Sequence, residues 1–187
     1  MTFRSALTSA AALALAACGS NEAADDRMTD EATATETAAT IDVPTPDAGT
    51  PQGFVDTVAA SDMFEIEAAR LAQEMGESDK VKAFAATMIK DHTASSDKLK
   101  AAVAEAGNGL AVAPALTPLQ QGDLDQLRGA GDNFDAMYAQ QQVHAHEAAL
   151  ALLQAQAQSG TVEQLKTFAG EAATVVEGHL DQARQLP

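Results

Sequence analysis

Apolar residues recur every three or four positions over four long stretches of this chain, which predicts four amphipathic helices that each bury one face. The stretches cover about residues 53–75, 79–106, 133–158 and 162–187. The chain is rich in Ala, Leu, Gln and Glu and contains no tryptophan, a composition that favours helix. The pattern shows no strand signal. We therefore predict an all-α fold.

Turn and capping residues predict how the helices connect. Ser78, Asp132 and Thr161 are suited to cap the second, third and fourth helices, and Thr161 forms a capping-box pattern with Gln164. Only short links join the first helix to the second and the third to the fourth, so each of these pairs is expected to form an antiparallel hairpin.

The connection between the two hairpins, residues 107–131, is much longer. Within it, Thr117 with Gln120 offers a second capping box and Pro118 fits the first helical position, which predicts a short helix over residues 118–128. One lengthwise connection between two hairpins is typical of ferritin-like proteins. The predicted architecture is a ferritin-like antiparallel four-helix bundle with a short extra helix in the crossover between helices two and three.

Polar residues interrupt the apolar stripes in a regular way. His92, His146 and His179 each lie on the buried stripe of a different predicted helix, and Glu65 has the matching place on the first helix. The fourth histidine, His144, points away from its stripe. We therefore expect four polar side chains to meet inside the bundle.

Two interpretations of this cluster remain open at the sequence level. In the first, Glu65 accepts hydrogen bonds from the histidines and the layer is a satisfied polar core, which we favour. In the second, Glu65, His92, His146 and His179 bind a divalent transition metal, since neutral imidazoles and a carboxylate are suitable ligands. The outer residues supporting such a site would be Asp91, Tyr138 and Gln142.

A di-iron site of the ferritin kind is not expected. Such sites use two Glu-x-x-His motifs, whereas Ile89 precedes His92 by three positions and Val176 precedes His179 by three. An oxidase function, which would need redox-active iron, is therefore disfavoured.

The N-terminal region predicts export and lipidation. Residues 1–17 have a short basic start and an apolar stretch typical of a signal peptide. Leu15-Ala16-Ala17-Cys18 resembles a lipobox, so we expect acyl chains such as palmitate on Cys18, the single cysteine, to anchor the chain to a membrane. Residues 18–52 are acidic and poor in apolar residues, which predicts a disordered linker ahead of a folded domain at residues 53–187.

Several functional classes are excluded or disfavoured by composition. The net charge of −16 opposes nucleic-acid binding because phosphates would be repelled. The chain has no glycine-rich phosphate loop and no nucleophile elbow. Met63, Met75, Met88 and Met137 have the soft sulfur that copper accepts, but their helical spacing is typical of packing residues. We expect the protein to be noncatalytic.

Several short motifs resemble one bacterial family. They are Phe54-Val55, Glu65-Ile66-Glu67, Val81-Lys82-Ala83-Phe84-Ala85, Met88-Ile89-Lys90-Asp91-His92-Thr93, Phe134-Asp135 and Lys166-Thr167-Phe168-Ala169. The folded part is thereby similar to the family called domain of unknown function 4142. The resemblance implies a ferritin-like bundle in the periplasm or at the outer membrane. The sequence departs from the family at Gln142-Val143-His144-Ala145-His146 and at Thr174-Val175-Val176.

Two functional hypotheses follow. The first is a noncatalytic lipoprotein of the cell envelope, facing the periplasm and anchored to the outer membrane, that serves in stress protection or protein interaction with a partner the sequence does not identify. The second is a metal-binding or metal-buffering protein that uses the Glu and His cluster. The absence of Asp next to Cys18 resembles outer-membrane sorting.

Overall fold

The computed structural model describes residues 48–187, and this part of the chain is helical without any strand. Its elements are α1 (Pro51–Met75), α2 (Asp79–Ala106), α3 (Pro118–Gly129), the 3-10 turn η1 (Gly131–Asn133), α4 (Phe134–Ser159) and α5 (Glu163–Ala183). None of these helices is long and apolar enough to cross a membrane. The predicted signal peptide, Cys18 and most of the predicted linker lie outside the described residues.

The first three helices begin at residues that satisfy their free N–H groups. The side chain of Thr50 accepts a hydrogen bond from the backbone of Gly53 at the start of α1, so this helix begins two residues before the predicted start. Ser78 caps α2 as predicted. Thr117 and Gln120 form the predicted capping box of α3.

The starts of the last two helices differ from the prediction. Asp132 lies in the 3-10 turn, and Asn133 precedes α4 without a side-chain cap. Thr161 does not cap α5 either, because the helix begins one residue later, after Val162. Both helices begin one residue after the predicted start, which lies within the usual spread of helix boundaries.

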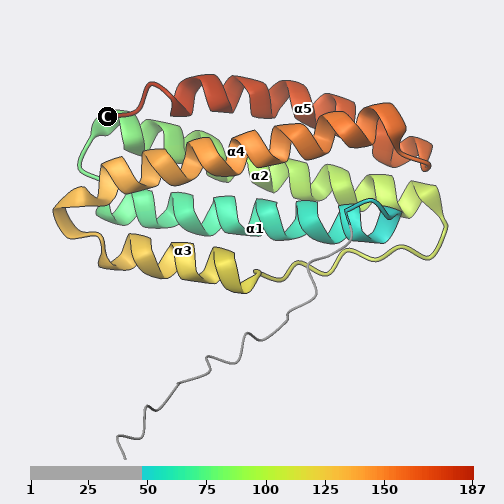
Figure 1. The fold of residues 1–187 in the computed structure, drawn as a ribbon, viewed down its shortest axis with the longest axis horizontal. Coiled ribbons are helices and arrows are strands. Elements are labelled where there is room, and N and C mark those ends of the chain that lie inside the picture. Colours follow the sequence, from blue (N-terminus) through green and yellow to red (C-terminus); the bar gives the residue numbers. More distant parts are fainter. Residues whose placement is uncertain (1–47) are drawn as a thin grey trace, which may run out of the picture. The chain divides into compact units, whose positions relative to one another are not determined.

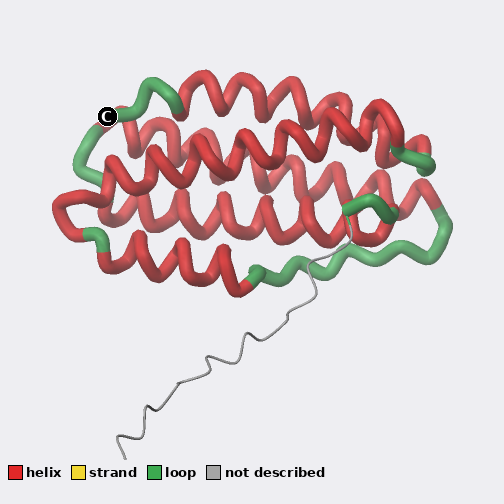
Figure 2. Tube along the Cα trace, in the orientation of Figure 1, coloured by secondary structure: helices red, strands yellow, loops and turns green. Residues whose placement is uncertain are grey.

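Short turns fix two antiparallel hairpins, α1 with α2 and α4 with α5 (Figure 1). In the first turn, a side chain on Gly76 would place its Cβ 2.5 Å from the carbonyl oxygen of Ala72, so only glycine fits. The α2 helix ends at Gly107, whose φ of 60° is the left-handed conformation that glycine adopts at helix ends. The chain then runs back along the bundle to α3 (Figure 2).

Each of the four long helices packs against two others, in the cyclic order α1, α2, α5, α4. Helices α2 and α4 run in the same direction because the crossover carries the chain back before α4 begins (Figure 1). The short helix α3 packs against α1 and α4. This is the predicted antiparallel four-helix bundle with an extra helix in a single crossover.

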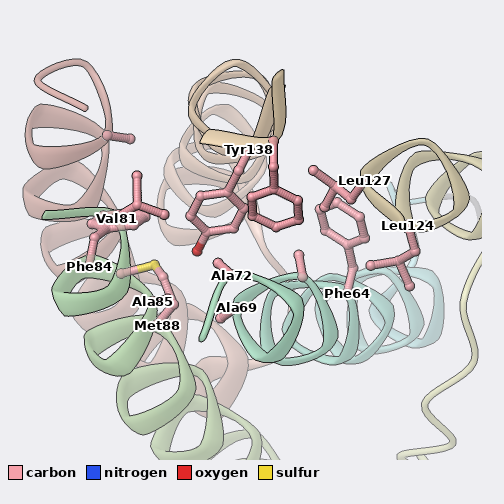
Figure 3. Close-up of a cluster of buried hydrophobic side chains, with 13 residues drawn as sticks. Phe64, Ala69, Ala72, Val81, Phe84, Ala85, Met88, Leu124, Leu127 and Tyr138 are labelled. Atoms are coloured by element: carbon pink, nitrogen blue, oxygen red, sulfur yellow. The ribbon is translucent and has the colours of Figure 1, made fainter. Parts of the chain in front are cut away.

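Two clusters of apolar side chains fill the bundle, one toward each end. The first contains Phe64, Phe84, Met88 and Tyr138. Figure 3 shows Leu124 and Leu127 of α3 packed beside Phe64 in this cluster. The second contains Phe54, Leu99, Leu165 and Phe168, among others.

A polar layer separates these two clusters. On every long helix, the residues of the polar layer lie between residues of one apolar cluster and residues of the other. All of them are buried: Asp62, Glu65, His92, Gln142, His146 and His179. The bundle therefore keeps six polar side chains at mid-length, where apolar residues would pack without a desolvation cost.

The buried face of α4 is turned slightly from the predicted one. Tyr138 and Gln142 are buried in its first half, whereas Ala139 and Val143 are only half-buried. His146 and Leu153 are buried as predicted, and His144 is exposed. The larger side chains occupy the interior, since they fill more of the space between the helices.

Candidate metal centre

Three histidines from three helices meet in the polar layer. His92 comes from α2, His146 from α4 and His179 from α5, and all three are buried. Their ring centroids are 5.5 to 5.7 Å apart, nearly an equilateral triangle. One nitrogen of each ring lies within 4.8 Å of a nitrogen on each of the others.

The protonation of His146 is fixed by a backbone carbonyl. Its Nδ1 lies 2.8 Å from the carbonyl oxygen of Gln142. Because a carbonyl oxygen only accepts, Nδ1 carries the proton and Nε2 is left with a free lone pair. Burial, with a further contribution from His92, lowers the pKa of His146 to about 4, so this ring is neutral at pH 7.

His92 is oriented by a carboxylate on α1. Its Nδ1 lies 2.8 Å from Oδ1 of Asp62, and the hydroxyl of Ser96 donates to Oδ2 of the same carboxylate at 3.2 Å. Burial alone would lower the pKa of His92, but the bond to Asp62 and the charge of Glu65 outweigh burial and raise it above the usual value. In the neutral ring, Nδ1 donates to Asp62 and Nε2 is bare.

His179 is held in the opposite way, through its Nε2. That nitrogen lies 3.1 Å from Oδ2 of Asp91, a half-buried residue of α2. Burial lowers the pKa of His179, and the charges of His92 and His146 lower it further, although Asp91 opposes them. Slight burial of Asp91 acts against its ionisation, but His179 and Lys90 hold its pKa below the usual value. The carboxylate therefore accepts, and Nδ1 of His179 is bare.

Each ring thus has one nitrogen bonded and one without a partner. The unpartnered atoms are His92 Nε2, His146 Nε2 and His179 Nδ1, and all three are buried within the described part of the chain. In metal sites, a histidine ligand usually donates its second N–H to a carboxylate or a backbone carbonyl, which is the arrangement seen on all three rings.

The size of the triangle suits one ion after a small contraction. Nitrogen atoms that bind one ion at about 2.0–2.1 Å in tetrahedral geometry lie about 3.3 Å apart. The upper limit of 4.8 Å between the ring nitrogens requires side-chain shifts of about 1 Å or less. Rotation about the side-chain bonds of the three histidines can supply such shifts.

Glu65 lies on the far edge of His146, beside the bonded nitrogen. Its Oε1 is 3.7 Å from Nδ1 of His146, and its Oε2 accepts a hydrogen bond of 2.6 Å from Nε2 of Gln142. Burial raises the pKa of Glu65 above its usual value, while His92 and the bond from Gln142 act against this. The structure therefore brings the three histidine rings together, leaves one buried nitrogen of each without a partner, and places Glu65 beside the bonded nitrogen of His146.

The other residues named from the sequence have clear positions. Asp91 and Gln142 each hydrogen-bond one of the histidines. Tyr138 packs within an apolar cluster, stacked on Phe134, and its buried hydroxyl has no hydrogen-bond partner among the described residues. Burial raises the pKa of Tyr138, so it stays neutral.

Asp62, which is 3% exposed and is the direct partner of His92, is not among the site residues predicted from the sequence. A signal for it exists in the chain. Asp62 lies four positions after Val58 and three before Glu65, so it occupies the same helical stripe.

A cavity of about 930 Å³ adjoins the histidines. Its wall is mostly apolar and includes residues from all five helices. His92 and His179 line it together with Asp62 and Asp91, but His146 does not. The cluster therefore borders this cavity through His92 and His179, whose unpartnered nitrogens are themselves shielded from solvent.

The sequence profile of a family described as Domain of unknown function (DUF4142) matches residues 30–186 of this chain. The match covers the whole bundle and each of its histidines. The chain belongs to the DUF4142 family. Comparison with curated proteins gives no match. The description of this family names no function. The activity therefore has to be inferred from the site.

One solved structure with a similar fold is described as CopM in the Cu(I)-bound form. It superposes with a TM-score of 0.62 and is 18% identical in sequence. The similar region covers 73% of this DUF4142 chain and 94% of the CopM chain. At 18% sequence identity, the comparison shows only that the two proteins share a helical fold.

Proposed function

We propose that this protein binds one transition-metal ion through His92, His146 and His179. The observation that carries the proposal is the set of three buried ring nitrogens that have no partner while the opposite nitrogen of each ring is hydrogen-bonded. Buried polar atoms without partners cost free energy, and each such group in a native protein calls for an explanation. A bound ion would satisfy all three atoms at once.

A purely structural polar core accounts less well for the same atoms. In such a core the histidines would bond to one another or to Glu65 through their free nitrogens. Instead, each histidine is hydrogen-bonded through its other nitrogen to a residue outside the triad, and Glu65 is bonded to Gln142. This arrangement favours metal binding over the structural interpretation that the sequence alone had favoured.

Copper is the ion we expect first. Imidazole nitrogen suits copper, zinc, iron and nickel, and among divalent ions copper(II) binds such ligands most tightly. The structurally similar CopM was solved with Cu(I) bound, which supports testing both oxidation states. The carboxyl groups of Asp62 and Glu65 lie in the same layer, and a bound cation would favour their ionised form, which offsets the charge of the ion.

The proposal is tested by metal loading of the untagged protein. After incubation with Cu(I), Cu(II) or Zn(II) and removal of free ion, elemental analysis should find one bound equivalent of at least one metal. The double variant His92→Gln, His146→Gln should lose it. His144→Gln is the matched control, because His144 is exposed and should leave loading unchanged. Absence of any stoichiometric metal, or full loading of the double variant, would refute the proposal.

We further propose that the protein acts at the cell envelope, tethered by a lipid on Cys18. This proposal is supported by the sequence Leu15-Ala16-Ala17-Cys18. Cys18→Ser should move the protein from the membrane fraction to the soluble fraction, measured by fractionation and immunoblotting. Retention of the variant in the membrane would contradict the lipid anchor.

A further inference from the structure

Exposed apolar side chains of the bundle gather at the cavity beside the histidines. Three large apolar side chains are exposed in the described part of the chain, and two of them, Leu119 of α3 and Val175 of α5, line this cavity. It also touches the buried side chains of Val58 and Val176, so it extends from the surface to the interior between the two hairpins. Its volume of about 930 Å³ falls within the range of about 300–1,000 Å³ for small-molecule sites.

Most charged groups on the wall of this cavity already have partners. Asp62 and Asp91 are each hydrogen-bonded to a histidine of the polar layer. Lys98 of α2 and Glu171 of α5 form an ion pair of 3.0 Å with each other. Asp123 of α3 also lines the cavity, but it takes part in no ion pair among the described residues.

Asp123 lies one helical turn after the exposed Leu119, on the same face of α3. Its carboxylate accepts a single long hydrogen bond, of 3.5 Å, from Nε2 of Gln126. The side chain is half-buried, and burial raises the pKa of Asp123, although the charge of His144 on α4 acts against this. A cation placed beside Asp123 would favour the ionised carboxylate and supply the partner that it lacks.

An apolar wall leads inward from Asp123. The side chain of Gln141 on α4 donates a hydrogen bond of 3.0 Å to the backbone carbonyl of Asp123, which fixes the two helices side by side here. Ala145 and Ala149 follow Gln141 at one and two turns along α4, and all three line the cavity. Two turns of helix span about 12 Å, which suits a short apolar chain that starts at Asp123.

We infer that this cavity binds a cationic amphiphile, a small molecule whose single ammonium group pairs with Asp123 and whose apolar chain lies along the alanines of α4. An anionic amphiphile fits less well, because the wall carries four carboxyl groups and one lysine. The inference does not depend on the metal ion, since Asp123 and the alanines hold the ligand without it.

The test titrates octylammonium into the metal-free full chain carrying Cys18→Ser, which lacks the expected acyl group and needs no detergent. Isothermal titration calorimetry should find one equivalent bound, with a dissociation constant about fivefold or more below that of octanol, because a half-buried carboxylate adds an ion pair. Octanoate should bind more weakly than octanol. Ethylammonium should show no measurable binding, since it has almost no apolar surface to bury.

A charge-removing variant tests the role of the carboxylate. Asp123→Asn should abolish the preference for octylammonium over octanol and leave the affinity for octanol unchanged. Asp125→Asn is the matched control, because Asp125 is exposed on the same helix, pairs with Arg128 and does not line the cavity. Octylammonium binding that is unchanged in Asp123→Asn, or weakened equally in both variants, would overturn the inference.

A cavity-filling variant tests the place of the chain. Ala149→Leu should weaken octylammonium and octanol at least tenfold, whereas Ala155→Leu changes an exposed position of α4 outside the cavity and should have no effect. Circular dichroism checks that each variant is folded, and the comparison of Asp123→Asn with Asp125→Asn decides the inference if Ala149→Leu does not fold. Absence of saturable binding of octylammonium to the unsubstituted cavity would also overturn it.

Discussion

Asp62 determines which nitrogen of His92 is available. Its carboxylate holds Nδ1 at 2.8 Å and is itself held by Ser96. Asp91 and the carbonyl of Gln142 do the same for the other two histidines. Three contacts, two from carboxylates and one from a backbone carbonyl, therefore leave each ring, when neutral, with one unshared lone pair. This preorganisation is what distinguishes the layer from an ordinary buried histidine cluster.

Asp62→Asn should weaken metal binding about 10- to 100-fold, because the amide has the shape of the carboxylate but lacks the charge that strengthens and orients the His92 ligand. The measurement is a competition titration with a chelator of known affinity. Asp97→Asn is the control, since Asp97 is exposed on the same helix as His92 and pairs with Lys100. An unchanged dissociation constant for Asp62→Asn would show that this contact has no part in the site.

His146 should make the stability of the metal-free protein depend on pH. Its pKa falls from the usual 6.5, which applies to the unfolded chain, to about 4 in the folded protein. Between these values the unfolded chain binds a proton that the folded chain excludes. The stabilisation linked to neutral His146 is therefore complete above about pH 6.5 and is lost as the pH falls toward 4.

From pH 7 to pH 5, wild-type protein should lose about 2 kcal/mol more unfolding free energy than His146→Gln. Urea unfolding at each pH measures this difference. His92 and His179 titrate in both proteins, so the difference reports His146 together with its coupling to these two rings. His144→Gln should follow the wild type. If His146→Gln and wild type lose stability in parallel, His146 does not resist protonation in the folded state.

At the residue scale, the stripe pattern was enough to predict that three histidines and Glu65 are buried in one layer. It could not predict which edge of each ring faces inward, because that depends on side-chain rotation. The hydrogen bond from His179 to Asp91, for example, joins helices that are not adjacent in sequence. Sequence spacing places residues on a face and does not orient them.

At the element scale, Asp135 links the start of α4 to the start of α2. Its carboxylate accepts hydrogen bonds from the backbone N–H groups of Glu77 at 3.1 Å and Ser78 at 2.8 Å. These groups stand at the N-terminus of α2, where free donors and the helix dipole favour a negative charge. One side chain therefore joins the two hairpins at this end of the bundle.

Asp135→Ala should destabilise the protein by about 1–2 kcal/mol, comparable with the loss of a helix cap. Asp132→Ala should change stability by less than about 0.5 kcal/mol, because Asp132 lies exposed in the 3-10 turn without a cap bond. Chemical denaturation of both variants measures the contrast. Equal effects would mean that the contact across the hairpins contributes nothing beyond local charge.

The capping motifs explain why some helix starts could be predicted and others could not. Thr117 with Gln120 is a local motif whose bonds need only four residues, and it occurs as predicted. Asp135 acts on a segment 57 and 58 residues away. A contact of that kind follows from the packing of one hairpin against the other, which no local pattern contains.

At the scale of the whole molecule, the polar layer divides one core into two. The number of helices, the hairpins and the crossover follow from the lengths of the links, so the topology could be predicted. The relative positions of the helices along the bundle axis could not be predicted. Counted from their shared turn, His146 and His179 are unequally distant, yet their ring centroids are 5.5 Å apart. The stagger of α4 and α5 brings them level, and packing alone determines it.

A bound ion would cross-link α2, α4 and α5 at the level where apolar packing is interrupted. Binding to the folded state alone stabilises it by mass action, so free metal at about 100 times the dissociation constant should add about 2.7 kcal/mol to the unfolding free energy. Thermal or urea unfolding in a metal-buffered solution at constant pH measures the gain. His179→Gln should remove most of it, because the ion then loses its link to α5, whereas His144→Gln should keep it. A stabilisation that survives His179→Gln would place the ion elsewhere on this acidic protein, since binding at the three-histidine layer requires the donor from α5.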